Sequence, residues 1–289
     1  MFGPNTVGSY QYEVWNSHRD IEFENLFLTL QGMFQDIFSL REYDILFIPG
    51  SGTAGIEAVI SSLNNPLKII GPEGKFQSRW SALAKHYHDA TTGPNEMFCQ
   101  LETSTSEIFY RENCIVDAVS SFPYYQIPKN TKVFITCCNK QLGAFPGVSI
   151  VGVRKDCWDM FKSSEIFSYL NLFLYKKYAK INQTPTTPPI ALLEHLLAEL
   201  SVLNINSLRS QVDYVSGLVV DAIGVDNFIG ETRCPVLTFK KESISDKLAK
   251  EWSLYGYGNS STLNYQIFTY SHPIEDYCDF VEEILNESS

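Results

Sequence analysis

Short apolar strands alternate with helical segments between residues 43 and 153, and this alternation limits the fold more than any other feature of the sequence. Strand patterns occupy residues 43–49, 66–71, 114–119, 132–137 and 148–153, and helical patterns occupy residues 54–65 and 75–89. The strands are apolar along nearly their whole length, which is typical of strands covered on both faces. We therefore predict an α/β fold with a mainly parallel sheet.

The rest of the chain predicts a second, smaller unit. A stiff bend at residues 184–189 ("TPTTPP") precedes helical patterns at residues 190–203 and 207–222. Residues 235–241, 247–258, 265–271 and 274–285 then follow in the order strand, helix, strand, helix. We predict a large domain of residues 1–204 and a small C-terminal α/β domain of residues 205–289.

Composition excludes several classes of function. The formal net charge of −11 offers no basic face to nucleic acid, and no apolar run is long enough to span a bilayer. The N-terminal segment lacks the basic and apolar regions of a signal peptide. The seven cysteines lack the spacing of a zinc site, so we expect no metal site and a reduced, cytoplasmic protein with buried thiols.

A lone lysine, Lys140, stands in the otherwise almost uncharged run "VFITCCNKQLGAFPGVSIVGV", residues 133–153. A lysine at the end of an apolar strand can simply extend its ammonium to water while its stem is buried. Burial of the amine lowers its pKa, however, which makes it a nucleophile toward carbonyls and the usual anchor of a pyridoxal Schiff base. That second interpretation needs a phosphate site and an acid for the pyridine nitrogen elsewhere in the chain.

Two other features supply these groups. The turn "GSGT", residues 50–53, lies between a strand and a helix, where free backbone N–H groups and the helix dipole bind an anion. Helix capping and close packing are the alternative explanation of its glycines. Asp117 lies near the C-terminal end of an apolar strand, where a buried carboxylate needs a cationic or hydrogen-bonding partner. Since active sites of open α/β sheets lie at that edge, Asp117 could pair with an arginine, a helix N-terminus or a protonated pyridine nitrogen.

With these features, the sequence resembles the class V aminotransferases of fold type I, which depend on pyridoxal 5'-phosphate (PLP), and is most similar to the 2-aminoethylphosphonate:pyruvate transaminases. The resemblance rests on "HRDIEFENLF" (18–27), "GSGTAGIEAVISSL" (50–63), "ETSTS" (102–106), "VDAVSSF" (116–122), "CNKQLGAFPGVSIV" (138–151) and "TPTTPPIALLEHLLAEL" (184–200). It implies a PLP-binding large domain with a small C-terminal domain, and a homodimer whose active sites are shared between subunits.

The resemblance also implies roles for single residues. Lys140 would bind the cofactor covalently and move the substrate proton, and Asp117 would pair with the pyridine nitrogen. The remaining cofactor-binding residues would be Ser51, Gly52 and Thr53 at the phosphate, Asn139 beside it, Phe76 over the ring, Thr105 near the phenolic oxygen, and Thr184 at the phosphate of the neighbouring subunit. Arg19 is the candidate contact for an anionic end of the substrate, because a guanidinium suits the oxygens of a phosphonate.

The sequence departs from the family pattern at the substrate carboxylate. Gln266 stands where the family has an arginine that grips the α-carboxylate, and a glutamine supplies no charge. Arg233 or Arg19 could take over this contact. The chain is also shorter than usual between "ETSTS" and Asp117, and Ser106 replaces a glycine of the family.

Three functions therefore stay open at this point. The first is transfer of an amino group between a small amine or amino acid, such as 2-aminoethylphosphonate, and an oxo acid such as pyruvate. The second is a PLP enzyme of changed reaction type, a decarboxylase, a lyase or an amine-selective enzyme, since the cofactor can labilise any of three bonds. The third is a noncatalytic protein on the same fold.

Overall fold

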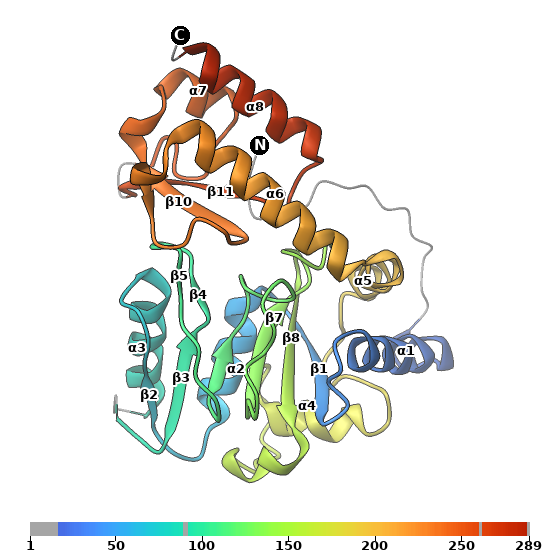
Figure 1. Cartoon of the computed structure of the whole chain (residues 1–289). Helices are drawn as coiled ribbons and strands as arrows, with labels where there is room; N and C mark the ends of the chain where they lie inside the picture. Colours follow the sequence, from blue (N-terminus) through green and yellow to red (C-terminus); the bar gives the residue numbers. More distant parts are fainter. Residues whose placement is uncertain (1–16, 89–91, 260–261, 288–289) are drawn as a thin grey trace.

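The computed structural model describes residues 17–88, 92–259 and 262–287, so the N-terminal segment searched for a signal peptide lies outside the described residues (Figure 1). Its centre is a six-stranded sheet in the order β1-β8-β7-β6-β3-β2. The strands are β1 (Tyr43–Pro49), β8 (Val148–Arg154), β7 (Val133–Cys137), β6 (Ile115–Asp117), β3 (Asn95–Cys99) and β2 (Leu67–Ile69). Strand β8 is antiparallel to both of its neighbours, β1 and β7. The pairs β7–β6, β6–β3 and β3–β2 are parallel. The predicted mainly parallel sheet is confirmed.

Helices cover both faces of this sheet. One face packs against α1 (Ile21–Ile37) and α5 (Ile190–Val202), and its core includes Ile45 and Phe47 of β1. The other face packs against α2 (Gly52–Ser62), α3 (Lys75–His88) and α4 (Leu172–Ala179), and its core includes Leu46 and Ile48 of the same strand. Successive strand residues thus enter opposite cores, which explains why the strands are apolar throughout.

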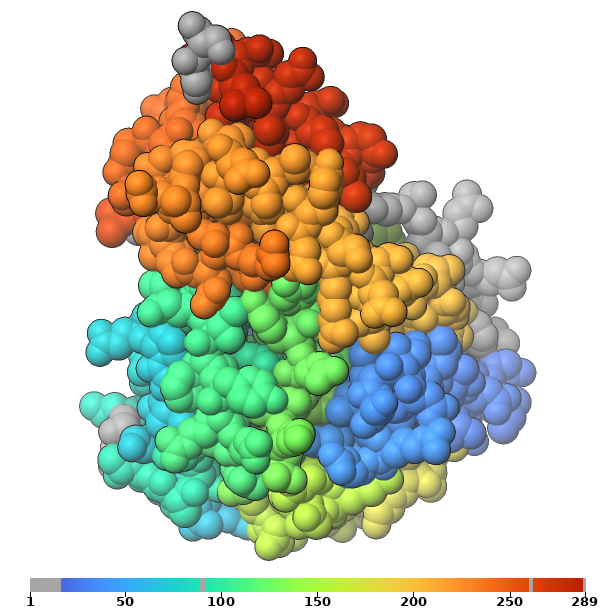
Figure 2. Space-filling view, viewed as in Figure 1, coloured from blue at the N-terminus to red at the C-terminus, as the bar shows by residue number. Residues whose placement is uncertain are grey.

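Residues 205–287 form a C-terminal group of elements with a core of its own. The group contains α6 (Ile205–Ile223), β9 (Phe228–Ile229), β10 (Val236–Lys240), α7 (Asp246–Glu251), β11 (Asn264–Phe268) and α8 (Ile274–Glu287). Its strands form an antiparallel sheet in the order β11-β10-β9, and residues such as Val219, Leu237 and Phe280 fill its core. Figure 2 shows this group, in orange and red, seated on the sheet domain. The boundary expected between residues 204 and 205 falls just before α6, and the division into two domains stays a prediction.

Several elements lie outside the sequence-based prediction. Helix α1 and strand β3 were not expected, and β3 is inserted between β2 and β6 in the sheet. A short hairpin of β4 (Leu101–Glu102) and β5 (Glu107–Ile108) and the two-residue strand β9 are also additions. Residues 155–160, 225–227 and 241–243 form 3-10 turns. No helix in the described part of the chain is long and apolar enough to cross a membrane.

All seven cysteines are free thiols, and all are buried except Cys278.

Candidate active site

Lys140 lies in the turn that joins β7 to β8. Its side chain is half-buried, and Nζ donates a hydrogen bond to Oγ of Ser120, 2.5 Å away, in the segment that follows β6. The turn is closed by backbone hydrogen bonds from Cys138 to Val148 (3.1 Å) and from Ala144 to Cys138 (3.0 Å). These bonds present the lysine amine at the C-terminal edge of β7, beside the end of β6.

Asp117 is the last residue of β6, and its carboxylate is buried at the same edge. Nε1 of Trp80 donates to Oδ2 (2.8 Å) and the backbone N–H of Val119 donates to Oδ1 (3.0 Å). Burial raises the pKa of Asp117, and the two hydrogen bonds and the charge of Lys140 offset this only in part. A further cation against this carboxylate would therefore be stabilised.

The glycine turn at residues 50–53 connects β1 to α2. Gly50 has a φ of +129°, and a Cβ on Gly52 would lie 2.6 Å from Cγ2 of Val119, so both positions favour glycine. Ser51 is the N-cap of α2, but its side chain makes no capping hydrogen bond. The N–H of Gly50 donates to the carbonyl of Gly147 (2.8 Å), which ties this turn to the loop that carries the lysine. The helix N-terminus suits an anion such as a phosphate.

One cavity of about 160 Å³ brings these groups together. Among its lining residues are Ser51, Gly52, Thr53, Phe76, Asp117, Asn139 and Lys140, all of them expected from the sequence. An amine for an aldehyde, a buried acid for a ring nitrogen, a helix N-terminus for a phosphate and an aromatic side chain thus surround one space. This set of groups fits PLP.

A second cavity of about 510 Å³ shares Phe76 and Lys140 with the first, and we call it the chamber. Its other lining residues are Lys75, Thr103, Ser104, Thr238, Tyr255, Thr262, Leu263, Asn264, Gln266 and Phe268. The chamber lies between the edge of the central sheet and strands β10 and β11 of the C-terminal group. It offers room for a substrate next to the lysine amine.

The turn at residues 103–106 joins the C-terminal group to the sheet domain. The Oγ1 of Thr238 donates to the carbonyl of Thr103 (2.7 Å), and Nε2 of Gln266 donates to the same carbonyl. Ser106 donates to the carbonyl of Val236 (2.7 Å) and accepts, at its own carbonyl, the N–H of Glu231 (2.9 Å). Gln266 therefore lines the chamber, but its amide N–H is engaged by the backbone of this turn.

Glu102, at the start of this turn, was not expected as a site residue. Its carboxylate is fully buried and accepts the backbone N–H groups of Phe76 (2.9 Å) and Gln77 (3.0 Å) at the N-terminus of α3. It also accepts the N–H (3.2 Å) and the hydroxyl (2.6 Å) of Ser104. A Cβ on Gly74 would lie 2.3 Å from Cδ of Glu102, so the chain approaches the carboxylate closely. Glu102 thus positions the helix that carries Phe76 and Trp80.

Three residues expected from the sequence do not line either cavity. The hydroxyl of Thr105 faces the carbonyl of Glu102 (3.5 Å), whereas its neighbours Thr103 and Ser104 line the chamber. Thr184 is buried and donates to the carbonyl of Thr186 (2.7 Å). Arg19 donates to Oε1 of Gln183 (2.6 Å), and its guanidinium lies 5.1 Å from the centre of the Tyr178 ring.

Other residues of the site had only weak signals in the sequence. Trp80 follows Phe76 by four residues, so the two rings share a helix face, with centres 6.2 Å apart. Ser120 follows Asp117 within the same motif, and Cys99 and Cys137 end the strands on either side of it. The parallel register, which the sequence does not reveal, brings these side chains together.

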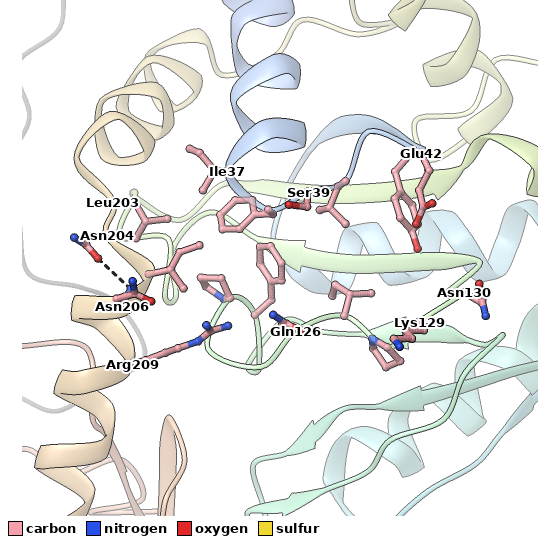
Figure 3. Close-up of a pocket in the computed structure, with 18 residues that line it drawn as sticks. Ile37, Ser39, Glu42, Gln126, Lys129, Asn130, Leu203, Asn204, Asn206 and Arg209 are labelled. Carbon is pink, nitrogen blue, oxygen red and sulfur yellow. Dashed lines mark hydrogen bonds between the residues drawn. The ribbon is translucent and has the colours of Figure 1, made fainter.

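A larger cavity, of about 590 Å³, lies elsewhere, between the end of α1, residues 122–130 and the start of α6 (Figure 3). Its rim carries Glu42, Lys129 and Arg209, and it contains none of the predicted site residues. We place the candidate active site at the two smaller cavities because the amine, the buried acid and the glycine turn meet there. Across the described residues, no group of three or more His, Cys, Asp or Glu side chains could hold a metal ion.

Comparison with known sequences finds only distant relatives, and no family model matches. A soluble hydrogenase 42 kDa subunit of Anabaena cylindrica is 26% identical over 239 aligned positions, which cover 67% of this chain and 62% of that protein. The match thus spans about three fifths of that relative's length. An uncharacterized aminotransferase of Methanocaldococcus jannaschii is 24% identical over 316 aligned positions, which cover 88% of this chain and 81% of that protein.

Solved structures match the fold over almost the whole chain. An aspartate aminotransferase of subgroup IV from Thermus thermophilus superposes with a TM-score of 0.80 at 17% identity, covering 99% of this chain and 98% of that one. The chain has the PLP-transferase fold of type I. Two further structures share this fold. An alanine–glyoxylate aminotransferase from Nostoc sp. has a TM-score of 0.77 at 18% identity, covering 93% of this chain and 89% of that one. A phosphoserine aminotransferase from Cytophaga hutchinsonii has a TM-score of 0.76 at 20% identity, covering 94% of this chain and 90% of that one.

Proposed function

We propose that this protein is a PLP-dependent aminotransferase that moves an amino group between a small amine or amino acid and an oxo acid. The main support for the proposal is that Lys140, Asp117 and the N-terminus of α2 line the same cavity. The names of the solved structures with this fold add support, because they are aminotransferases and one of them, from Trichomonas vaginalis, is described as PLP-bound.

The residues of the first cavity would hold the cofactor by its three functional parts. The N–H groups at the start of α2, with the hydroxyls of Ser51 and Thr53, would hold the phosphate. Asp117 would hold a protonated ring nitrogen, whose charge would compensate the burial of the carboxylate. Phe76 would cover one face of the ring and exclude water.

When bound, PLP supplies an electron sink that makes the C–H bond beside the amino group acidic. Lys140 would take that proton at Nζ and return it to the carbon of the cofactor that keeps the amino group. The hydroxyl of Ser120, 2.5 Å from Nζ, orients the amine between the cofactor cavity and the chamber. The adjoining chamber walls, which include Phe76 and Phe268, would limit the access of water during this transfer.

The finer form of the proposal is a transaminase for 2-aminoethylphosphonate and pyruvate that works in the cytoplasm as a homodimer with shared sites. In such a dimer, Thr184 would contribute to the neighbouring subunit's site, and Arg19 is the candidate that the sequence offers for an anionic end of the substrate. A decarboxylase or lyase reaction is the second candidate, because Gln266 supplies no charge for an α-carboxylate and its amide N–H is engaged by Thr103. A noncatalytic protein is the third.

The absorption spectrum of the purified protein with added PLP tests the proposal. We expect a visible band in the wild type that borohydride removes, with the reduced cofactor recovered on the peptide that contains Lys140. Lys140→Ala should lack both the band and the labelled peptide, and Lys85→Ala, an exposed lysine of α3, should keep both. Products formed from a panel of amines and amino acids then separate transamination from decarboxylation. Absence of a band and of any reducible adduct in the wild type contradicts both enzymatic functions.

A further inference from the structure

The chamber has a distinct distribution of charge. Two of its lining residues, Lys140 and Lys75, are cationic, and none is anionic. Lys140 lies at the boundary with the cofactor cavity and is the reacting amine of the proposed function. Lys75 is the first residue of α3 and is exposed, so this residue lies on the solvent side of the chamber. The chamber therefore has a reactive end at Lys140 and an outer end at Lys75.

Four polar side chains of the chamber wall already donate hydrogen bonds within the protein. Thr238 donates its hydroxyl to the backbone of the 103–106 turn (2.7 Å), and the amide of Gln266 donates to the same carbonyl. Ser104 donates to a buried carboxylate (2.6 Å), and Thr262 donates to a backbone carbonyl (2.9 Å). A carboxylate attached to the reacting carbon would thus meet uncharged groups, four of which already use a donor within the protein, and these are a poorer site for an anion than a cation is.

The side chain of Lys75, in contrast, carries a charge and lies at an exposed position. Its backbone N–H is held by Oγ of Ser104 (3.0 Å), which fixes the start of the side chain. In the part of the chain that the structure describes, no carboxylate forms a salt bridge with its ammonium. A cation that forms no salt bridge among the described residues, on a chain whose net charge is −11, is available to an anionic ligand.

We propose that Lys75 binds the anionic group of a substrate whose amine and anion stand at opposite ends of the molecule. The class comprises ω-amino carboxylates, as opposed to α-amino acids. This inference rests on the proposed function, since Lys140 must be the reacting amine for the outer end to receive the anion. It assigns the anion contact to Lys75 in place of Arg19, whose guanidinium is bonded to Gln183.

Pairs of isomeric substrates test this inference, because the isomers differ only in where the carboxylate stands. The rate at which the visible band of the PLP-loaded protein disappears is measured with β-alanine against L-alanine, and with 4-aminobutanoate against L-2-aminobutanoate. We expect kcat/KM to favour the ω-isomer by at least about tenfold in one or both pairs, the equivalent of about 1.4 kcal/mol of binding. Lys75→Gln should remove most of this preference through KM, with kcat little changed, and Lys75→Arg should restore it.

Lys85→Gln is the matched control, since it removes the same charge from an exposed position of the same helix. It should leave the preference unchanged. Calorimetric binding of 4-hydroxybutanoate and 2-hydroxybutanoate, which lack the amine, adds a readout that needs no turnover. The 4-isomer should bind more tightly to the wild type, and Lys75→Gln should abolish the difference.

The outcomes separate this inference from the proposed function. A PLP-loaded protein that reacts equally well or better with the α-isomers of both pairs overturns the inference and leaves the aminotransferase. A preference for the ω-isomers that persists in Lys75→Gln also overturns the inference and leaves the aminotransferase. A protein that forms no adduct with PLP overturns the proposed function, and the inference with it.

Discussion

Glu102 offers the sharpest test of how the site is held together. Its buried carboxylate receives hydrogen bonds from Phe76, Gln77 and Ser104, and these link the start of α3 to the β4–β5 hairpin. Glu102→Ala leaves all of these donors without their acceptor, and each buried donor left unsatisfied costs about 1–3 kcal/mol. Glu102→Gln keeps one acceptor oxygen for the helix, but its NH₂ group must then face the N–H of Ser104, which costs about 1–3 kcal/mol.

Urea denaturation followed by circular dichroism measures both changes as a loss of unfolding free energy. Glu107→Gln is the matched control, because Glu107 is the cross-strand partner of Glu102 in the same hairpin but is exposed. It should change stability by less than about 0.5 kcal/mol. The affinity for PLP should fall with Glu102→Gln and not with the control, since α3 carries Phe76. If Glu102→Gln is as stable as Glu107→Gln, the carboxylate does not hold the helix and the reasoning fails.

Three further changes test other parts of the site. Burial raises the pKa of Asp117, so its protonated form stabilises the cofactor-free protein below the ordinary aspartate pKa, and this contribution is lost as pH rises through the raised value. The unfolding free energy of the wild type minus that of Asp117→Asn should therefore fall with rising pH, and a flat difference contradicts this. Gly52→Ala places a methyl group 2.6 Å from Val119 and should cost about 1–3 kcal/mol in urea denaturation, whereas Gly217→Ala, with open space around it, should not destabilise. Thr238→Val removes a buried hydrogen bond between the two parts of the chain, and calorimetric unfolding should show a loss of about 0.5–1.5 kcal/mol; an unchanged melting temperature would refute that role.

The sequence was enough to predict the centre of the candidate site. Asp117 ends a strand whose sequence is apolar on both faces, and Lys140 and the turn at residues 50–53 each follow such a strand. The strands β1, β6 and β7 run in the same direction, so their C-terminal ends meet at one edge of the sheet, and the three features converge there. Local sequence patterns were therefore sufficient to predict these three features, because each depends mainly on its own strand.

Contacts between distant residues explain what the sequence could not reveal. Gln266 lies 163 residues from Thr103 along the chain, and no local pattern announces their hydrogen bond. The same holds for Ser106, which has a φ of +49° and is bonded to Val236 in the C-terminal group. These tertiary bonds set the direction of the turn, so that Thr103 and Ser104 face the chamber and Thr105 does not. Helix α1 was not predicted either, because the start of its segment, residues 18–27, indicated only a family motif.

The bonds between the 103–106 turn and residues 231–266 have a consequence for engineering this protein by recombination. The C-terminal group supplies one wall of the chamber, so exchanging it for that of another fold type I protein is an obvious way to alter specificity. Such a crossover at residue 204 would replace the two side chains that donate to the carbonyl of Thr103 and the segment whose backbone N–H donates to the carbonyl of Ser106. A chimera should retain its fold only when the short hairpin of residues 101–108 is exchanged together with residues 205–289. The two segments, nearly a hundred residues apart, should therefore be exchanged together.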